Sequence, residues 1–520
     1  MLKKVFSILV VMACCLTASA DSVEESVQMA KRNIERGVAI ADATWDVSMK
    51  GSTRNMYMAD QYDTSSGWTS GASDVWPLTA AIEAHCSLLE ALNAVREYDE
   101  ALYTAYYSQY ESQLKTLIYN LDFYRGTYTR PSYATTDTRW RPYAVPRASV
   151  RGGANVTGIL NVYDDQMWLC RELIRAYRLT NNEEYLTTAT YLADYCIDGW
   201  DCWRDASGKE YGGITWGPGY NSKHACSNAP FIQPLVWLSD IYRNTNEEMT
   251  YYYRNTKNEP VNESRLRSEL YLEFAIKIYD WQREHLYDRS GVYFDMMGAD
   301  GTIIIKDGYR GHVDCGGAGG AFYPYNTGTM ISGAAELYRV TSEVRFQEDL
   351  TKSASGANSK FSTYVRKLGT YDYKTDETAE NGFLTWFNNV LMRSYADALD
   401  YATNLAPKTG LNAFQTNLDY AFENFARNNL LPIHLLTGWG DETKTKAFHQ
   451  FTFVAQYGVL AQYHIRNAKS SGVEDVVVDK PIEDEMVYSL SGVCLGKLSE
   501  IRSQIPAGIY IVGGRKVAIK

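Results

Sequence analysis

Two adjacent carboxylates, Asp164 and Asp165, are the residues whose types and spacing best suit chemistry. They precede the run Gln166–Tyr177, whose apolar residues recur at three- and four-residue steps and predict a helix. The pair would then occupy the first helical turn, where unpaired N–H groups and the helix dipole favour negative charge. Two carboxylates held together beside the aromatic residues Tyr163 and Trp168 cannot ionise equally. One is pushed to keep its proton, which sets an acid beside a base or nucleophile.

A purely structural role is the alternative for such a pair, because acidic residues at a helix start often serve only as caps. The surroundings favour a functional pair instead. Tyr163 precedes the two aspartates, Trp168 follows one turn later, and Arg171 is the one possible charged partner close by in the sequence.

The run from Tyr163 to Trp168, Tyr-Asp-Asp-x-x-Trp, resembles the motif of glycoside hydrolase family 76, the endo-acting α-1,6-mannanases. Two later blocks resemble that family in the same order. The block Gly212–Leu238 keeps three family residues, Trp216, Lys223 and Asn228, and has His224 where Asn is usual. The block Phe322–Tyr338 keeps Tyr325, Asn326 and Gly328, with Thr327 in place of Gln. The resemblance extends from Trp76 to about residue 465.

The resemblance implies a retaining glycoside hydrolase that cleaves internal α-1,6-mannosidic bonds of fungal or yeast-type mannan. It assigns Asp164 as nucleophile and Asp165 as general acid/base, an order of roles that comes from the family. Retaining enzymes hold these carboxyls about 5 Å apart, and neighbours on a helix, splayed by about 100°, can supply that separation. The expected substrate-binding residues are Tyr163, Trp168, Trp216, Asn228, Tyr325 and Asn326.

Two other classes of function remain open from the sequence. Another carbohydrate-active enzyme with an (α/α)6 barrel is one of them. An epimerase would need two histidines in the cleft, for which His224 and His312 are the available pair, and a uronyl hydrolase would need basic residues beyond Arg171 and Lys223. A non-catalytic glycan-binding protein of a sugar-utilisation system is the other, but it has no need of two adjacent acids.

The composition of the chain limits the classes of molecule that it can be expected to bind. The net charge of −11 is spread along the 520 residues without a basic stripe, which argues against nucleic acid. The 41 Tyr and 12 Trp residues include more aromatic faces than a core requires, and such faces stack on sugar rings. The expected partner is therefore an α-mannan polysaccharide or oligosaccharide. Seven histidines and no Cys-x-x-Cys pair predict neither a metal nor a cofactor, and we expect a monomer.

The first 20 residues predict a secretory signal peptide. Lys3 and Lys4 precede the apolar stretch Val5–Leu16, and Ala18-Ser19-Ala20 forms a small-residue cleavage site. We therefore expect export to the periplasm, the cell surface or the medium. Neither this stretch nor a later one is long enough to span a membrane. Cleavage would leave seven cysteines, and an odd number requires at least one free or intermolecular thiol.

Helical periodicity dominates residues 21–470 and predicts an all-α catalytic domain. Amphipathic stretches lie near 24–41, 79–97, 101–121, 165–179, 183–198, 224–244, 263–286, 327–341, 345–367, 384–402, 411–428 and 447–468. Three of them end in a shared Tyr-Arg-x-Thr phrase before the next acidic helix start, at Tyr177, Tyr242 and Tyr338. Twelve helices paired as six hairpins predict an (α/α)6 barrel, the fold that the family resemblance also implies. The segments before three inner helices would then converge at one end.

Residues 471–520 change character and predict a linker followed by a short β-rich tail. Pro506–Lys520 reads as a hairpin about Gly513-Gly514. This tail resembles the sorting signals of secreted Bacteroidetes proteins. A terminal hairpin that docks on the catalytic domain is the equal alternative.

Overall fold

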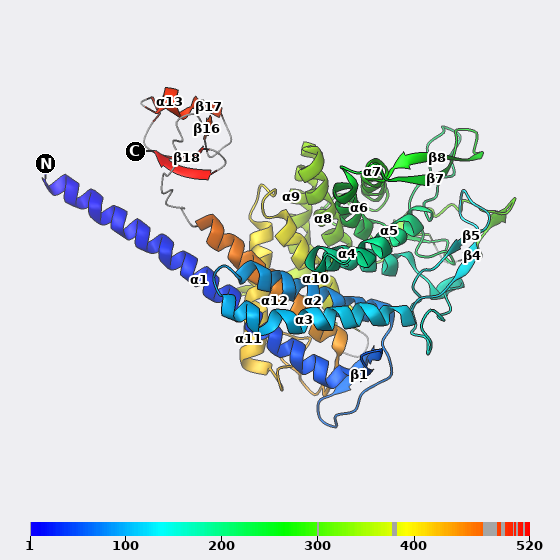
Figure 1. Cartoon of the computed structure of the whole chain (residues 1–520), viewed down its shortest axis with the longest axis horizontal. Coiled ribbons are helices and arrows are strands. Elements are labelled where there is room, and N and C mark those ends of the chain that lie inside the picture. The colour runs from blue at the N-terminus through cyan, green and yellow to red at the C-terminus, as the bar shows by residue number, and fades with distance from the viewer. Residues whose placement is uncertain are drawn as a thin grey trace. The chain divides into compact units, whose positions relative to one another are not determined.

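The helical periodicity of the sequence is realised in twelve long helices (Figure 1). The computed structural model describes residues 2–298, 301–376, 382–471, 486–489, 494–502, 504–505, 508–512 and 515–519. The long helices are α1 (Leu2–Ser48), α2 (Val75–Val95), α3 (Glu100–Asn120), α4 (Tyr163–Thr180), α5 (Glu183–Ile197), α6 (Ile232–Tyr242), α7 (Arg267–His285), α8 (Pro324–Thr341), α9 (Val344–Phe361), α10 (Leu384–Ala398), α11 (Ala406–Phe425) and α12 (Ala447–Ser471).

The even-numbered helices form an inner ring within the unit Lys31–Gln462. Helix α2 packs on α4, α4 on α6, α6 on α8, and α8 on α10. Helix α12 closes the ring, because Gly458 lies directly against Ser87 of α2 and the ring of Phe448 lies 6.3 Å from that of Trp386 on α10.

The odd-numbered helices stand behind the inner ring. Each of α3, α5, α7, α9 and α11 packs on the inner helix that precedes it in the chain. Helix α1 pairs with α12 through Gly37 and Tyr457. Five hairpins and the pair of α1 with α12 therefore close into the predicted (α/α)6 barrel.

Short strands decorate the connections between the helices. They are β1 (Met49–Ser52), β2 (Asn55–Met58), β3 (Gln61–Asp63), β4 (Tyr128–Arg130), β5 (Thr138–Trp140), β6 (Lys223–His224), β7 (Glu248–Arg254), β8 (Pro260–Leu266), β9 (Met296–Met297), β10 (Ile305–Lys306), β11 (Tyr309–Arg310), β12 (Ala318–Gly319), β13 (Ser362–Val365), β14 (Thr370–Tyr373) and β15 (Lys444–Lys446). Most pair as local antiparallel hairpins. The long-range pairs are β3 with β15, and β9 with β6 and β12.

The predicted helix 263–286 begins too early. Helix α7 starts at Arg267, and the residues before it form strand β8, which pairs antiparallel with β7. Aromatic and β-branched residues from Thr250 to Tyr253 favour a strand, and Asn258 adopts the positive φ of 61° that a tight turn requires. Helix α6 also begins later than predicted, at Ile232, after a 3₁₀ turn at Ala229–Phe231.

The C-terminal residues that the structure describes are β-rich, as predicted. Strands β16 (Met486–Tyr488), β17 (Cys494–Lys497), β18 (Gly508–Val512) and β19 (Arg515–Ile519) form one sheet, beside the short helix α13 (Leu498–Ile501). Val487, Leu498 and Val512 make a small core of their own. Strands β18 and β19 are the arms of the predicted hairpin, whose turn at Gly513-Gly514 lies outside the described residues.

The predicted signal peptide and domain boundaries stay predictions. Residues 2–20 belong to the long helix α1, and α12 runs to Ser471, while most of the predicted linker lies outside the described residues. Of the helices that the structure describes, none combines the length and the apolar character needed to cross a bilayer.

A buried ionic network fills part of the barrel axis. Its members are charged side chains on α2, α4 and α10 that are mostly hidden from solvent, namely Glu83, Glu90, Arg171, Glu172, Arg175 and Arg393. Glu83 pairs with Arg393, and also accepts hydrogen bonds from the indole of Trp386 at 3.1 Å and the amide of Asn389 at 3.1 Å. Arg175 bridges Glu172 and Glu90, each at 2.7 Å. The network thus ties three inner helices together.

We expect Gly328→Ala on α8 to destabilise the fold. A Cβ there would lie 2.9 Å from Leu391 Cα and 3.0 Å from the Val390 carbonyl oxygen, both on the backbone of α10. At an exposed position inside a helix, replacing Gly by Ala would raise the free energy of unfolding by about 1 kcal/mol. Here the two helix backbones must separate, and we expect a loss of about 1–3 kcal/mol in the free energy of unfolding. The midpoint of urea unfolding, followed by circular dichroism, measures it.

Gly37→Ala on α1 is the matched control. Its added Cβ would meet its nearest neighbour, Tyr457 Cβ, at 3.4 Å, an ordinary contact, so this variant should unfold at the same urea concentration as the parent or higher. A Gly328→Ala variant as stable as the Gly37→Ala variant would contradict the close packing of α8 on α10.

Candidate active site

Asp164 and Asp165 lie in the first turn of α4, as the sequence predicts. The start of this helix is held from outside. The Tyr163 N–H donates to the Trp216 carbonyl oxygen at 2.8 Å, and the Gln166 side chain binds both the N–H and the carbonyl oxygen of Tyr143. These bonds fix the first turn against two neighbouring loops, so the carboxyls are presented in one orientation.

The Asp164 carboxyl lies in a mostly apolar setting with few donors. The indole Nε1 of Trp216 lies 3.4 Å from its Oδ2, the Cys226 thiol donates to it, and its Oδ1 is buried without a partner. Burial raises the pKa of Asp164 to about 6, and the donors from Cys226 and Trp216 offset only part of that rise. This carboxyl is therefore ionised above about pH 6.

The Asp165 carboxyl is more strongly perturbed. It is 6% exposed, and burial raises its pKa well above the usual range. The negative charges of Asp164 and then of Asp74, the exposed residue that precedes α2, raise this pKa further. Asp165 is consequently the member of the pair that keeps its proton, and the two adjacent residues hold an acid beside a base or nucleophile.

A third carboxylate, Asp295, lies near the pair and was not predicted as a site residue. The Tyr325 hydroxyl donates to its Oδ1 at 2.8 Å, and the Ala225 N–H donates to its backbone oxygen at 2.7 Å. Cys226, next in the chain, feels the charges of both Asp164 and Asp295. Asp295 and Cys226 come from segments more than 60 residues beyond the dyad, and nothing in the sequence pairs them with it.

An aromatic cluster supports the pair from within the barrel. Its rings come from the first turns of inner helices and the segments just before them, and they are Trp76, Trp168, Tyr323, Tyr325, Trp386, Phe387 and Phe448. Trp168, one turn after the dyad, meets Trp386 edge to face at 4.9 Å and is 4% exposed. Tyr325 packs on Phe387 at 4.5 Å. Water has little room between these rings, which explains the strong effect of burial on the two carboxyls.

Three predicted substrate-binding residues are fully buried. The Tyr163 ring packs on Tyr195 at 5.1 Å, on the side of α5. The Asn228 amide binds backbone groups of Ile214 and His224, and the Asn326 amide reaches the Tyr293 carbonyl oxygen. The direct sugar contacts predicted for these three residues stay predictions.

Trp216 is placed differently, and its partly exposed ring lies beside the dyad. It stacks on His224 at 4.9 Å and meets the tilted ring of Tyr220 at 4.6 Å. His224, the departure from the family motif, therefore supports the Trp216 ring.

The polar residues invoked for the rival functions are occupied elsewhere. Lys223 forms a buried ion pair with Asp201 at 2.8 Å, and His312 binds the same carboxylate at 2.7 Å. Burial alone would raise the pKa of Asp201, but Lys223 and His312 outweigh it, and this pKa lies below its usual value. Arg171 belongs to the buried ionic network. Neither a histidine pair nor a basic cluster therefore faces the dyad among the residues that the structure describes.

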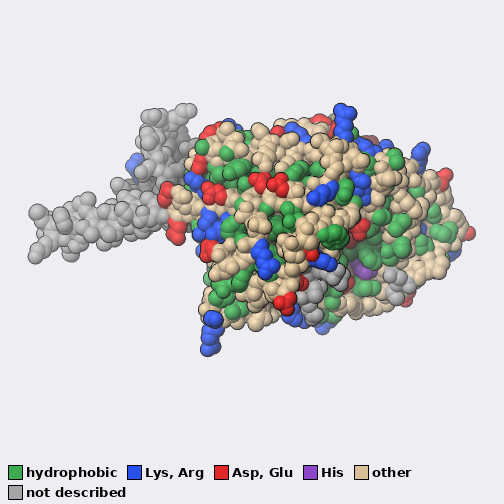
Figure 2. Space-filling view, turned by 90° about the horizontal axis from the view of Figure 1, so that it is seen from below, with side chains coloured by type: hydrophobic (Ala, Val, Ile, Leu, Met, Phe, Trp, Pro, Cys, Tyr) green, Lys and Arg blue, Asp and Glu red, His purple; other side chains and the backbone are tan. Residues whose placement is uncertain are grey.

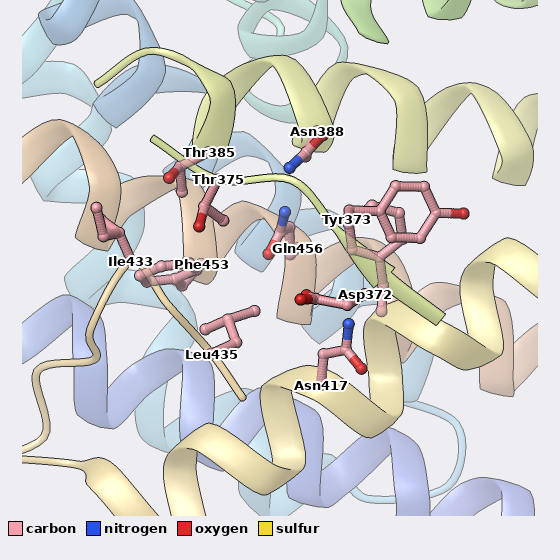
Figure 3. A pocket seen from close by; sticks show the side chains of 11 residues that line it. Asp372, Tyr373, Thr375, Thr385, Asn388, Asn417, Ile433, Leu435, Phe453 and Gln456 are labelled. Carbon is pink, nitrogen blue, oxygen red and sulfur yellow. The ribbon is translucent and has the colours of Figure 1, made fainter. Parts of the chain in front are cut away.

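A separate pocket lies between α10, α11, α12 and β14 (Figure 3). Three of its oxygens are buried without a partner, those of Thr385, Asn388 and Gln456. An ordered water suits such a set. Asp372 is the acidic residue of its lining, so the pocket does not offer the two carboxyls that hydrolysis of a glycoside uses.

Comparison with known proteins points in the same direction as the site. The model of glycosyl hydrolase family 76 matches residues 153–257 and 265–432, together more than half of the chain. The mannan endo-1,6-alpha-mannosidase DFG5 of Saccharomyces cerevisiae is 26% identical over 195 residues. That match covers 37% of this chain and 35% of the yeast protein, about a third of each.

Solved structures show the same fold. The family 76 mannosidase Bt3792 of Bacteroides thetaiotaomicron is 19% identical, with a TM-score of 0.59 over 84% of this chain and 100% of that one. The α-1,6-mannanase GH76A of Salegentibacter is 19% identical, with a TM-score of 0.53 over 82% of this chain and 99% of that one. The family match covers the dyad, Trp216 and Tyr325 alike, and the chain belongs to glycosyl hydrolase family 76.

Proposed function

We propose that this protein is an exported, retaining endo-α-1,6-mannanase. The observation that carries the proposal is the split environment of two adjacent carboxyls, with Asp165 held protonated and Asp164 ionised above about pH 6. The names of the relatives supply the substrate. An inactive variant of the Salegentibacter mannanase, in which two consecutive aspartates are replaced, forms a complex with α-1,6-mannotriose.

The geometry supports a double displacement with Asp164 as nucleophile. In the first step an Asp164 oxygen attacks the anomeric carbon, the glycosidic C–O bond breaks, and Asp165 gives its proton to the departing oxygen. In the second step Asp165 takes a proton from water, whose oxygen attacks the same carbon and breaks the ester to Asp164. Trp216 is the proposed sugar contact beside the nucleophile, and Trp168 excludes water beneath it.

The surface suits a neutral polysaccharide. Basic and acidic side chains are interspersed on the face that Figure 2 presents, and neither sign gathers there into a broad patch. We propose further that the first 20 residues direct export and that the enzyme acts as a monomer in the periplasm or outside the cell.

Replacing each aspartate in turn should separate the two roles. We expect Asp164→Ala to abolish turnover of every substrate, because no glycosyl-enzyme can form. We expect Asp165→Ala to lose hydrolysis of α-1,6-mannan, whose leaving group needs a proton. The second variant should still react with a mannoside that carries a good leaving group, and added azide should restore release as the α-mannosyl azide. Product analysis by proton NMR measures both results.

The stereochemistry of the parent enzyme provides the check on this pair. Retention requires α-anomeric products in the first minutes of mannan hydrolysis. Release of the β-anomer would refute the double displacement, and near-normal activity of both alanine variants would reduce the pair to a helix cap.

The acidic limb of the pH profile of kcat/KM should report the ionisation of Asp164. Activity should fall as the pH drops through about 6, because the raised pKa of Asp164 then leaves the nucleophile protonated. Trp216→Phe should move this limb to higher pH, since the indole N–H stabilises the ionised carboxyl. Trp439→Phe is the control, because that indole binds the Phe425 carbonyl oxygen instead of a carboxylate. If the fall in kcat/KM occurs at the same pH in Trp216→Phe as in the parent, it does not come from the ionisation of Asp164.

Cleavage should begin inside the polymer. Early products from a long α-1,6-mannan should form a ladder of oligosaccharides, as endo action requires. Chromatography of the products in the first few per cent of turnover is the measurement. Mannose as the sole early product would show exo action instead.

A further inference from the structure

Trp68 is a large aromatic side chain with half of its surface, 50%, exposed. It lies on a tight turn after β3, where the Asp63 N–H donates to the Trp68 carbonyl oxygen at 2.9 Å and the Asp63 carboxylate binds the Ser65 hydroxyl at 2.7 Å. The Thr64 N–H donates to the Thr443 carbonyl oxygen at 2.8 Å, just before β15. The turn is thus anchored at both ends, and it presents the indole to solvent in a defined place.

Strand β15 carries two lysines toward the same face. Lys444 and Lys446 are two residues apart, and side chains with that spacing project from one side of a strand, about 7 Å apart. The Lys444 ammonium lies 5.8 Å from the centre of the Trp68 ring, and the Lys446 ammonium lies 5.9 Å from that of Phe383. Lys446 also pairs with Asp60 at 3.6 Å.

Phe383 connects this face to the candidate active site. Its ring is 45% exposed and lies 5.2 Å from that of Trp76, a member of the aromatic cluster. Trp76 follows Asp74 at the start of α2, and the charge of Asp74 acts on Asp165. Trp76 and Phe383 thus link the aromatic cluster to Lys446 on β15, and Lys444 of the same strand lies beside Trp68.

We propose that Trp68, Lys444, Lys446 and Phe383 form an outer glycan-binding strip, which holds sugar residues of a long chain that lie remote from the bond being cleaved. The inference rests on the proposed function of the dyad. Trp68 and Phe383 offer flat faces to the C–H faces of sugar rings. The two ammonium groups and the Asp60 carboxylate supply hydrogen bonds to hydroxyls.

The family model matches one member of the strip, Phe383, and not the other three. Trp68, Lys444 and Lys446 lie outside residues 153–257 and 265–432, which match the family model. The strip combines two segments that are distant in the sequence, the turn after β3 and strand β15, and the pairing of β3 with β15 brings them together. The strip would thus set the preference of this enzyme for long substrates, while the family residues perform the cleavage.

Trp68→Ala tests the strip by the length dependence of the kinetics. On long α-1,6-mannan we expect KM to rise about fivefold to tenfold with kcat unchanged, since a lost stacking contact is worth about 1 kcal/mol. On an aryl mannoside, which cannot reach the strip, both constants should equal those of the parent. Tyr98→Ala is the control, because that exposed aromatic lies in the turn between α2 and α3, at the far end of α2 from the dyad. It should behave as the parent on both substrates.

A binding measurement separates the strip from catalysis. In the Asp164→Ala background, the affinity for α-1,6-linked mannooligosaccharides should rise with their length, and the additional Trp68→Ala change should flatten that rise. Titration calorimetry gives both series, and Trp68→Phe should recover part of it. Equal length dependence with and without Trp68 would overturn the strip while leaving the dyad intact. A parent enzyme that neither cleaves nor binds α-1,6-mannan would instead refute the proposed function itself.

Discussion

The charge buried along the barrel axis is the constraint on which the rest of the structure depends. Moving an ion out of water costs several kcal/mol, and this cost is offset only when each charge finds partners in good geometry. Glu83 finds them in Arg393, Trp386 and Asn389, all on α10, although it stands on α2 itself. Arg175 on α4 finds them in Glu90 of α2 and in Glu172 of its own helix. A slip of any of these three helices by one turn would leave an unpaired charge inside the protein, so the network selects one register.

Trp386 links the buried ionic network to the surroundings of the two carboxyls. Its indole N–H donates to Glu83, and its ring meets Trp168, which stands one turn after the dyad. The same side chain therefore contacts both the ionic network and the aromatic cluster. Because the cluster excludes water, burial is the largest cause of the raised pKa of both Asp164 and Asp165, and for Asp165 it exceeds the effect of the charges of Asp164 and Asp74. The asymmetry between the two carboxyls then follows from the additional charge of Asp74 and from the donors that face Asp164.

The sequence predicted what local patterns determine. Helical periodicity located the members of the barrel, and adjacency alone placed the dyad on one turn of α4. It failed where pairing across the chain decides the outcome. Strand β8 forms by pairing with the tyrosine-rich strand β7, and this pairing is not visible in the local pattern. The predicted helix 263–286 therefore included the last residues of β8. Asp295 likewise lies near Asp164 through Tyr325 and Cys226, which come from other parts of the chain. The assignment of Asp164 as nucleophile comes from the family resemblance and stays a prediction.

The placement of both carboxyls on one helical turn has a mechanical consequence. Their separation is set by the geometry of a single α-helix, which is stiff, whereas the aromatic and polar groups around them belong to other helices and loops. Motion of the surrounding helices and loops can therefore change the environment of the two carboxyls without changing their backbone spacing. A change in the loops at this end of the barrel can then alter the surroundings of the two carboxyls, while the spacing of their Cα atoms along α4 stays the same.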